Sequence, residues 1–453
     1  MTAETHRVLS NTPLNSEPPL DRLISSFFTP TELAFNRNHG EFLTESASSY
    51  KLSLSSEVAG VPSGKVLSLN DLKAFPKHEV IAVLACAGNR RIEMDEEKEV
   101  EGLKWGGSAI CNAHFSGPLL REVLESADIA LEETLRARNR SGELHLHFET
   151  TQNCEDDRFY GSSLPLEMAL DPERPVMLAY EMNGEPLTEA HGFPLRLVAP
   201  GIIGARSVKW LERIILRDHE SDNFYMAKDY KVLPPQATPE TKAQYLEKVS
   251  PMMEFPLNSE ICQPTEHAVV DVKIPNPTVE VKGYAMGSKG TPIAAVYVTL
   301  VPLPIASSPP APTSHSASPG AELTSRELPR IRLAAAALAP SAWTTAQLVH
   351  RPPGAHGDVG EEGKNWGWTL WSAAVPVPAE ALQFAELGVG GQGAGVAIVA
   401  YARAASLSFF FAPARLKDVD GNKQELQTQW NLRGIAEASW SVSRIKIRKA
   451  PVA

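Results

Sequence analysis

The chain has 453 residues, a formal net charge of −11 and 43% hydrophobic residues, the composition of a globular protein long enough for two domains. The acidic balance argues against general binding to nucleic acid or to anionic membranes. No apolar run is long enough to span a bilayer. A local basic pocket is compatible with these totals, and it would bind a small anion rather than a polymer.

The cysteines and the chain ends bear on the cellular compartment. The four cysteines, Cys86, Cys111, Cys154 and Cys262, include no CxxC pair, so we expect reduced, mostly buried thiols. The N-terminal stretch MTAETHRVLSNTPLNSEPPL lacks the apolar core of a secretory signal, and the C-terminus is not a peroxisomal tripeptide. We therefore expect a cytosolic protein, with the mitochondrial intermembrane space and the peroxisome as alternatives.

The first domain is predicted to mix strands and helices. Residues 1–25 are polar and predict a disordered arm, and residues 26–254 carry both strand-like and helical patterns. VIAVLACA (residues 80–87) is short, apolar and partly β-branched, as in a buried strand. GPLLREVLESADI (residues 117–129) places its apolar side chains on one helix face and has proline near its start. PVMLAYEMNGEPL (residues 175–187) predicts a strand that meets a turn at its Asn-Gly pair.

The second domain, residues 255–453, is predicted to be all-β. Short β-type runs follow one another without a long helix, which is typical of a sandwich. Two stretches do not fit. A low-complexity insertion covers about residues 304–340, and its Pro/Ser/Ala-rich part, residues 307–320, predicts disorder. An odd Gly-rich and Phe-rich insertion covers about residues 388–416. Our hypothesis for these is a retained intron in the gene model, which a transcript containing both stretches would refute.

Polar and basic residues gather in several loops. AFNRNHGEF contains Arg37, Asn38 and His39, and CAGNRR places Arg91 five residues after Cys86. Taken singly, each pattern is more often a polar loop or a buried thiol beside surface arginines. Together they favour an anion site, because arginine suits bidentate oxyanion recognition and a thiolate is a soft metal ligand. Later loops add further candidates: Trp105, His191, Arg196, Arg206, Ser207, Lys209, Tyr230 and Arg433.

Five motifs carry a resemblance to a known family. CAGNRR, AYEMNGEPL, HGFPLRLVAPGIIGARSVKWL, KDYK and WNLRG resemble the sulfite oxidase family of molybdenum enzymes, in the same order, from about residue 35 to residue 433. The resemblance implies an α+β fold, with a molybdopterin-binding catalytic domain followed by an immunoglobulin-like domain that forms a homodimer. It also implies one molybdenum–molybdopterin cofactor per chain and sulfite as the substrate.

The resemblance also assigns roles to residues. It implies that Cys86 supplies the thiolate ligand to molybdenum. The implied cofactor-binding residues are Phe35, Asn36, Arg37, Asn38, His39, Cys86, Gln152, His191, Arg196, Ser207, Val208 and Lys209. The implied catalytic residues of the substrate pocket are Arg37, Arg91, Trp105, Tyr230 and Arg433.

Within this family, one position separates two activities. Related nitrate reductases carry methionine where this chain has Arg433, so arginine there indicates sulfite. The sequence before Phe35 is too short for a haem domain, so we expect no haem and, as in the plant-type enzymes, oxygen or another external acceptor for the electrons. Two positions depart from vertebrate members, which have aspartate where Gln152 aligns and lysine where Glu101 stands. These departures put the fine affinity in doubt.

Two alternatives stay open from the sequence. The first is a nitrate reductase-like molybdenum enzyme, which Arg433 argues against. The second is an interaction protein of the same fold that has lost its cofactor. The intact set of candidate site residues argues against it, whereas the two odd insertions keep it open.

Overall fold

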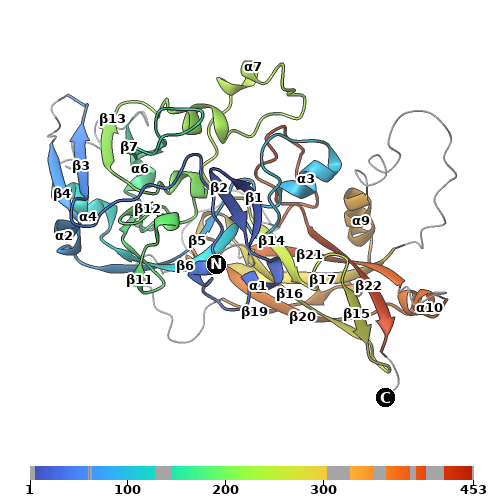
Figure 1. The fold of residues 1–453 in the computed structure, drawn as a ribbon. Helices are drawn as coiled ribbons and strands as arrows, with labels where there is room; N and C mark the ends of the chain where they lie inside the picture. The colour runs from blue at the N-terminus through green and yellow to red at the C-terminus, as the bar shows by residue number, and fades with distance from the viewer. Residues whose placement is uncertain are drawn as a thin grey trace, which may run out of the picture.

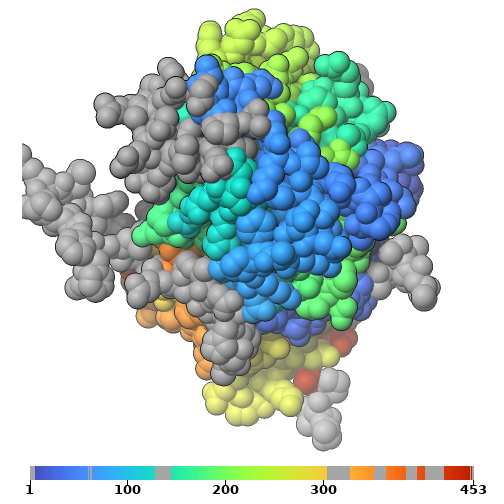
Figure 2. Space-filling view, turned by 90° about the vertical axis from the view of Figure 1, so that its left-hand side faces the viewer, coloured from blue at the N-terminus to red at the C-terminus, as the bar shows by residue number. Residues whose placement is uncertain are grey.

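The structure is a computed structural model that describes residues 6–59, 61, 64–127, 144–303, 327–350, 364–387, 394–404 and 423–450. Its first part mixes strands and short helices, coloured blue to green in Figure 1, and its second part is rich in strands, coloured yellow to red. The two parts pack side by side, and Figure 2 shows the blue and green surface of the first part above the yellow surface of the second. Among the strands of the described residues, no sheet combines strands from both parts.

The first part contains two main sheets. One has the strand order β4-β3-β13-β7-β8, in which only the β13–β3 pair is parallel, and the other has the order β11-β10-β6-β5. Strands β12 and β9 form a separate antiparallel pair. The strands are β3 (Lys51–Ser56), β4 (Lys65–Ser68), β5 (His78–Ala85), β6 (Ile110–Gly117), β7 (His145–Glu149), β8 (Gly161–Pro165), β9 (Met177–Ala179), β10 (Glu181–Met182), β11 (Glu185–Pro186), β12 (Arg196–Val198) and β13 (Arg213–Arg217).

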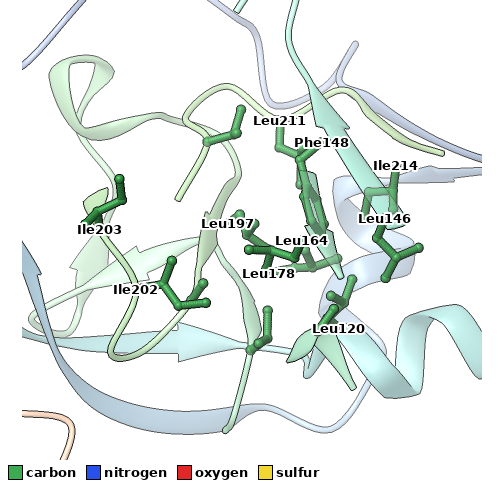
Figure 3. Close-up of a cluster of buried hydrophobic side chains, with 14 of the residues drawn as sticks. Leu120, Leu146, Phe148, Leu164, Leu178, Leu197, Ile202, Ile203, Leu211 and Ile214 are labelled. Carbon is green, nitrogen blue, oxygen red and sulfur yellow. The ribbon is translucent and has the colours of Figure 1, made fainter. Parts of the chain in front are cut away.

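Short helices connect these strands. Helix α2 begins with a capping box, in which the Ser68 hydroxyl accepts from the Asp71 backbone and the Asp71 carboxylate accepts from the Ser68 backbone. Apolar side chains of the five-stranded sheet, of helix α4 and of one face of β5 and β6 share one core, part of which Figure 3 shows. The helices are α2 (Leu69–Lys73), α3 (Arg91–Glu97), α4 (Leu120–Glu125), α6 (Leu166–Ala169) and α7 (Ala243–Leu246).

The predicted elements of the first part are confirmed. Strand β5 covers the apolar run and ends at Ala85, one residue before Cys86, with its last six residues buried. Helix α4 lies inside the predicted helix, whose last two residues are outside the described chain. The Asn183-Gly184 turn joins β10 to β11, and both residues adopt positive φ.

The second part is a sandwich of two sheets. Their strand orders are β14-β16-β20-β19 and β15-β22-β21-β17-β18, and their inner faces share one hydrophobic core. The fold prediction is therefore confirmed. The elements are β14 (Asn258–Gln263), β15 (Val269–Val272), β16 (Thr278–Met286), β17 (Ile293–Pro302), α9 (Glu327–Ala336), β18 (Thr344–Thr345), β19 (Gln347–Val349), β20 (Thr369–Pro376), α10 (Ala379–Leu387), β21 (Ala394–Ala404) and β22 (Ser441–Lys449).

The predicted disordered arm is wrong for residues 6–25. This segment forms a hairpin of β1 (Arg7–Asn11) and β2 (Leu14–Glu17), followed by α1 (Leu20–Leu23). Buried polar groups hold it, since the Glu17 carboxylate accepts the Gly106 backbone N–H at 2.9 and 3.0 Å. A polar composition predicts disorder only when the polar groups stay in water. Residues 1–5 lie outside the described chain.

The two predicted insertions contain ordered elements, and their being insertions stays a prediction. Residues 327–336 form α9, whose Ile331 packs against β17 and β21 and whose Arg332 is buried beside Glu93 of α3. Residues 394–404 form β21, the central strand of its sheet. Their alanine-rich and glycine-flanked sequences look like low complexity, but their small and apolar side chains pack. The predicted disorder of residues 307–320, and residues 388–393 and 405–416, lie outside the described chain.

Candidate active site

The end of β5 presents a thiol in a tight turn. Cys86 is 5% exposed, its backbone N–H donates to the Ala109 carbonyl at 2.9 Å, and the Gly88 N–H donates to its Sγ at 3.4 Å. A Cβ atom on Gly88 would lie 2.6 Å from Nη2 of Arg91. A larger residue at this position would displace the Arg91 guanidinium, which folds back over the turn.

A cavity of about 800 Å³, including the open space at its mouth, lies beside this thiol. Loop residues after β2 form one wall, and the loops around β12 form another. Cys111 also lines it, but burial raises the pKa of the Cys111 thiol to about 12, so this thiol stays protonated at neutral pH. The lining residues are Phe35, Arg37, Asn38, His39, Leu84, Cys86, Ala87, Cys111, Gln152, Tyr160, Met182, His191, Arg196, Gly204, Ala205, Ser207, Lys209, Trp210 and Tyr230.

Several basic groups of this cavity are buried, and burial lowers their pKa values. Burial, with Arg196 and Arg37 nearby, holds the pKa of Lys209 well below its ordinary value. Burial lowers the pKa of Arg196 to about 10. It also lowers the pKa of His191 to about 3, with help from Lys209 and Arg196. Burial lowers each of these pKa values because charge is costly away from water, and neighbouring positive charges add to the effect for Lys209 and His191.

Hydrogen bonds to uncharged oxygen atoms fix the positions of Lys209 and Arg196 and leave their charges unpaired. Lys209 Nζ donates to Asn38 Oδ1 and to the Ala190 carbonyl, at 2.8 Å for the latter. Arg196 donates to the His191 and Ser207 carbonyls at 3.0 and 3.1 Å. Within the described parts of the chain, no carboxylate forms an ion pair with Lys209 or Arg196.

The donor set of the cavity fits a phosphate-bearing cofactor. Buried cations without carboxylates need an anion, which a phosphate supplies, and the neutral His191 and Tyr160 offer hydrogen bonds to a flat heterocycle. In the described residues, no group of three or more His, Cys, Asp or Glu side chains could hold a metal ion.

A second cavity, of about 880 Å³ with its open mouth, meets the first at the same thiol. Both are lined by Arg37, Asn38, His39, Cys86 and Tyr230. The second cavity adds other side chains from both parts of the molecule. These are Ser10, Thr12, Pro13, Asn15, Arg91, Glu101, Gly102, Leu103, Glu155, Asp156, Asp229, Arg433 and Ile435.

Three guanidinium groups converge on the second cavity. Arg91 is buried and donates to the Gly434 and Leu103 carbonyls at 3.1 and 2.9 Å. Burial, with Arg91 nearby, lowers the pKa of Arg433. Arg37 donates to the Asn38 carbonyl at 2.5 Å. Such a cluster is arranged to hold the oxygens of a small anion close to the Cys86 sulfur.

Two neutral side chains complete the boundary between the cavities. The His39 Nε2 and Tyr230 hydroxyl lie 2.7 Å apart. Burial, with Arg37, Arg433 and Lys209 nearby, holds the pKa of His39 well below its ordinary value, and burial raises the pKa of Tyr230. This pair therefore stays neutral near pH 7 and can donate a hydrogen bond into the anion pocket.

Most of the predicted site residues line one of the two cavities. Asn36, Val208 and Trp105 line neither. Trp105 is fully buried behind the thiol and packs edge-on against Phe35, with ring centroids 6.4 Å apart. Arg206 is also fully buried, and it donates to the Tyr225 and Met252 carbonyls rather than into a cavity.

Two departures and two missed residues refine the site. Gln152 is buried, and its Nε2 donates to the Gly40 and Glu41 carbonyls at 3.0 and 2.8 Å, so it braces the loop after His39. Glu101 lies 3.5 Å from Arg433. Asp229 pairs with Arg433, and its only signal in the sequence was its place beside Tyr230 in KDYK. Tyr160 had no signal.

Comparison with known proteins gives the family. A model of the oxidoreductase molybdopterin binding domain matches residues 39–225, and a model of the Mo-co oxidoreductase dimerisation domain matches residues 249–301. A sulfite oxidase of Arabidopsis thaliana is 40% identical over 298 residues, which cover 65% of this chain and 72% of that protein. The chain belongs to the sulfite oxidase family. The predicted family is thus confirmed.

Other relatives set the breadth of this family. The mitochondrial sulfite oxidase of Drosophila melanogaster is 32% identical over 97% of this chain, and the chain spans 62% of that protein. An inducible NADH nitrate reductase of Glycine max is 36% identical over 65% of this chain and 33% of its own length. The crystal structure of the sulfane dehydrogenase SoxCD from Paracoccus pantotrophus shares the fold, with a TM-score of 0.64, 18% identity, and coverage of 98% of this chain and 91% of that one.

Proposed function

We propose that this chain binds a molybdenum–molybdopterin cofactor and oxidises sulfite to sulfate as a homodimer. Two electrons pass to an external acceptor, for which we propose oxygen. The observation that carries the proposal is the convergence of Arg37, Arg91 and Arg433 on a cavity that ends at the Cys86 thiol. An uncharged side chain at the Arg433 position would remove one of the three positive charges that face the anion in this pocket.

The residues of the first cavity would hold the cofactor. Lys209 and Arg196 would bind its phosphate, His191 and the His39 loop its heterocycle, and Cys86 its metal. The bound cofactor supplies the two-electron oxidation and the oxygen atom that sulfite gains. In the balanced reaction, sulfite and water give sulfate, two protons and two electrons. With oxygen as the acceptor, these make hydrogen peroxide.

The protein's own contribution is orientation and electrostatics. The three arginines hold the oxygens of sulfite, so that its sulfur lone pair faces the cavity floor at Cys86. The neutral Tyr230 hydroxyl, fixed by His39, donates a hydrogen bond to an oxygen there. The short hydrogen bonds of Arg91 to backbone carbonyls keep its guanidinium plane from rotating away.

The deciding experiment is the visible absorption spectrum of the protein purified from a host that makes molybdopterin. We expect a sulfur-to-molybdenum band that bleaches when sulfite is added without oxygen, and that returns with hydrogen peroxide formation when oxygen is admitted. Cys86→Ser should lose the band and the activity, whereas Cys262→Ser, on β14 and outside both cavities, should keep both.

Other outcomes would redirect the proposal. A band that ignores sulfite but returns with nitrate after chemical reduction would favour the nitrate reductase-like activity. A band that bleaches with sulfite yet returns only with an added electron carrier would remove oxygen as the acceptor. The absence of any band in a folded protein would favour an interaction protein without cofactor.

A further inference from the structure

A carboxylate of the second cavity, Glu101, contacts the Arg433 guanidinium. Glu101 lines the second cavity, and its Oε2 lies 3.5 Å from Nη1 of Arg433. Its position is fixed, because its backbone N–H donates to the Leu432 carbonyl at 2.8 Å. Asp229 holds the other side of the same guanidinium. Arg433 therefore reaches the pocket with much of its charge already neutralised.

Glu101 is in turn held by a lysine outside the cavity. Lys242 Nζ donates to both carboxylate oxygens of Glu101, at 2.8 and 2.9 Å. Lys242 does not line the cavity, and its side chain is 36% exposed against 27% for Glu101. The negative charge that Glu101 presents to the pocket is thus set by two basic groups, one inside the pocket and one outside.

The charges of substrate and product make this arrangement consequential. Near neutral pH sulfite is a mixture of monoanion and dianion, whereas sulfate is a dianion. The Coulomb energy of an anion beside a fixed carboxylate scales with the anion's charge, so a dianion is repelled twice as strongly as a monoanion at the same place. A pocket with three arginines alone would retain sulfate.

We propose that Glu101 is a positioning residue that sets the charge tolerated in the substrate pocket. It holds Arg433 in competition with the bound oxyanion, and it thereby speeds the release of the dianionic product. The inference rests on the proposed oxidation of sulfite for the identity of the product. The selection against dianions follows from the geometry of Glu101, Arg433 and Lys242 alone.

The first test compares two anions of the same shape and different charge. Sulfate and perchlorate are both tetrahedral oxyanions, and each is titrated by calorimetry into the purified holoprotein at constant ionic strength. For Glu101→Gln we expect the Kd of sulfate to fall about tenfold and that of perchlorate about threefold, because the removed repulsion is twice as large for the dianion.

The second test inverts the sign. Lys242→Met removes the partner that neutralises Glu101 from outside, so the Kd of sulfate should rise about threefold. Loss of local structure would weaken sulfate binding in both variants, whereas the proposal requires opposite changes. In turnover with sulfite, Glu101→Gln should show stronger inhibition by sulfate and a lower kcat.

Equal changes for sulfate and perchlorate, or a weaker binding of sulfate in both variants, would overturn the proposal. The proposed function fails separately. If the protein does not oxidise sulfite and the two binding tests still give the expected signs, the role of Glu101 in selecting against dianions stands. If sulfite is oxidised and Glu101→Gln leaves sulfate inhibition unchanged, only the role of Glu101 in product release falls.

Discussion

At the scale of single residues, the two cavities differ in how their buried cations are paired. In the cofactor cavity, Lys209 and Arg196 form no ion pair with a carboxylate of the described residues, so the protein without cofactor bears their desolvation cost. In the substrate cavity, Glu101 and Asp229 already partner Arg433. We therefore expect a cofactor that is held tightly and an anion that exchanges readily.

The first prediction concerns Arg433. Arg433→Met removes one charge-assisted contact to the anion, worth about 2 kcal/mol, so the KM for sulfite should rise roughly thirtyfold. Steady-state kinetics measure it, and the exposed Arg22→Met is the control. An unchanged KM would remove Arg433 from the substrate pocket.

The second prediction concerns Lys209. Lys209→Met keeps the volume of the side chain and removes its charge. After dialysis, the variant should therefore hold at most about one tenth of the cofactor that the unchanged protein holds. The cofactor-free form should at the same time become more stable, with a Tm higher by a few degrees, because a poorly solvated cation is gone. Cofactor fluorescence after release and thermal unfolding measure the two effects, and Lys248→Met on the surface is the control. A lower Tm in the cofactor-free form would contradict this account.

At the scale of elements, the N-terminal hairpin and helix α3 support the site from behind. Asn15 on β2 accepts the Asn38 backbone N–H at 2.9 Å through its side-chain oxygen, and it receives Arg37 Nη1 at 3.3 Å. The Asn38 side chain donates to the Leu14 carbonyl at 2.6 Å. The hairpin thus fixes the loop that both cavities share.

The third prediction follows from this support. Asn15→Ala leaves a buried N–H group unpaired, which costs about 1–3 kcal/mol, so the loop of residues 35–39 should open more often. Hydrogen exchange of that loop should become faster by roughly tenfold or more, and the KM for sulfite should rise. Asn15→Asp keeps the acceptor oxygen and should restore most of the protection. Equal exchange in all three proteins would show that the hairpin is dispensable.

Helix α3 joins a buried ionic network. Arg90, just before the helix, is fully buried and pairs with Glu93 and Glu260, at 2.7 and 2.8 Å. Arg332 on α9 is also fully buried, and it pairs with Glu93 at 2.5 Å and Glu97 at 3.4 Å. Burial is the main cause that raises the pKa of Glu97 to about 7. The nearby Glu437 carboxylate raises it further, and Arg332 opposes the rise.

The fourth prediction is a pH dependence. The pKa of Glu97 is about 7 in the folded protein and 4.5 in its ordinary state, so folding favours its protonated form. Its contribution is complete below pH 4.5, and stability is lost as the pH rises from 4.5 to 7, by about 3 kcal/mol at most. Between pH 5 and pH 8, the Tm of Glu97→Gln should therefore fall by less than the Tm of the unchanged protein. The exposed Glu99→Gln should show the same fall as the unchanged protein. An equal fall in Tm in all three proteins would show that Glu97 does not take up a proton on folding in this pH range.

At the scale of the whole molecule, the substrate pocket belongs to both parts. The segment around Arg433 joins the first part through backbone hydrogen bonds, from Ala436 to the Ala87 carbonyl at 3.0 Å and from Glu101 to the Leu432 carbonyl. In Figure 1, α3 lies beside the red C-terminal segment. Unfolding of the sandwich would remove Arg433 from the pocket.

The fifth prediction concerns assembly. Because the second part matches a dimerisation domain, light scattering on the purified protein should give twice the chain mass of 49.2 kDa. The mass should stay constant on dilution through the micromolar range. A mass of one chain with full sulfite oxidation would show that catalysis does not require dimerisation.

The cytosolic compartment stays a prediction.

The sequence was informative where chemistry is local and silent where it depends on distant packing. Cys86 and the arginines stand in short motifs, so the anion pocket could be predicted. The hairpin could not, because the partner of Glu17 is a backbone group some 90 residues away. The same holds for α9, whose alanine-rich sequence looks unstructured until Arg332 meets Glu93.

The two cavities also differ in when their residues become available during synthesis. Every residue that lines the cofactor cavity has been made once Tyr230 is added, whereas the substrate cavity waits for Arg433 and Ile435. At the usual pace of translation, the ribosome needs roughly 10–40 s to cover that interval. A nascent chain in this interval offers its cofactor ligands before its substrate site exists, so cofactor loading can precede any chance of turnover.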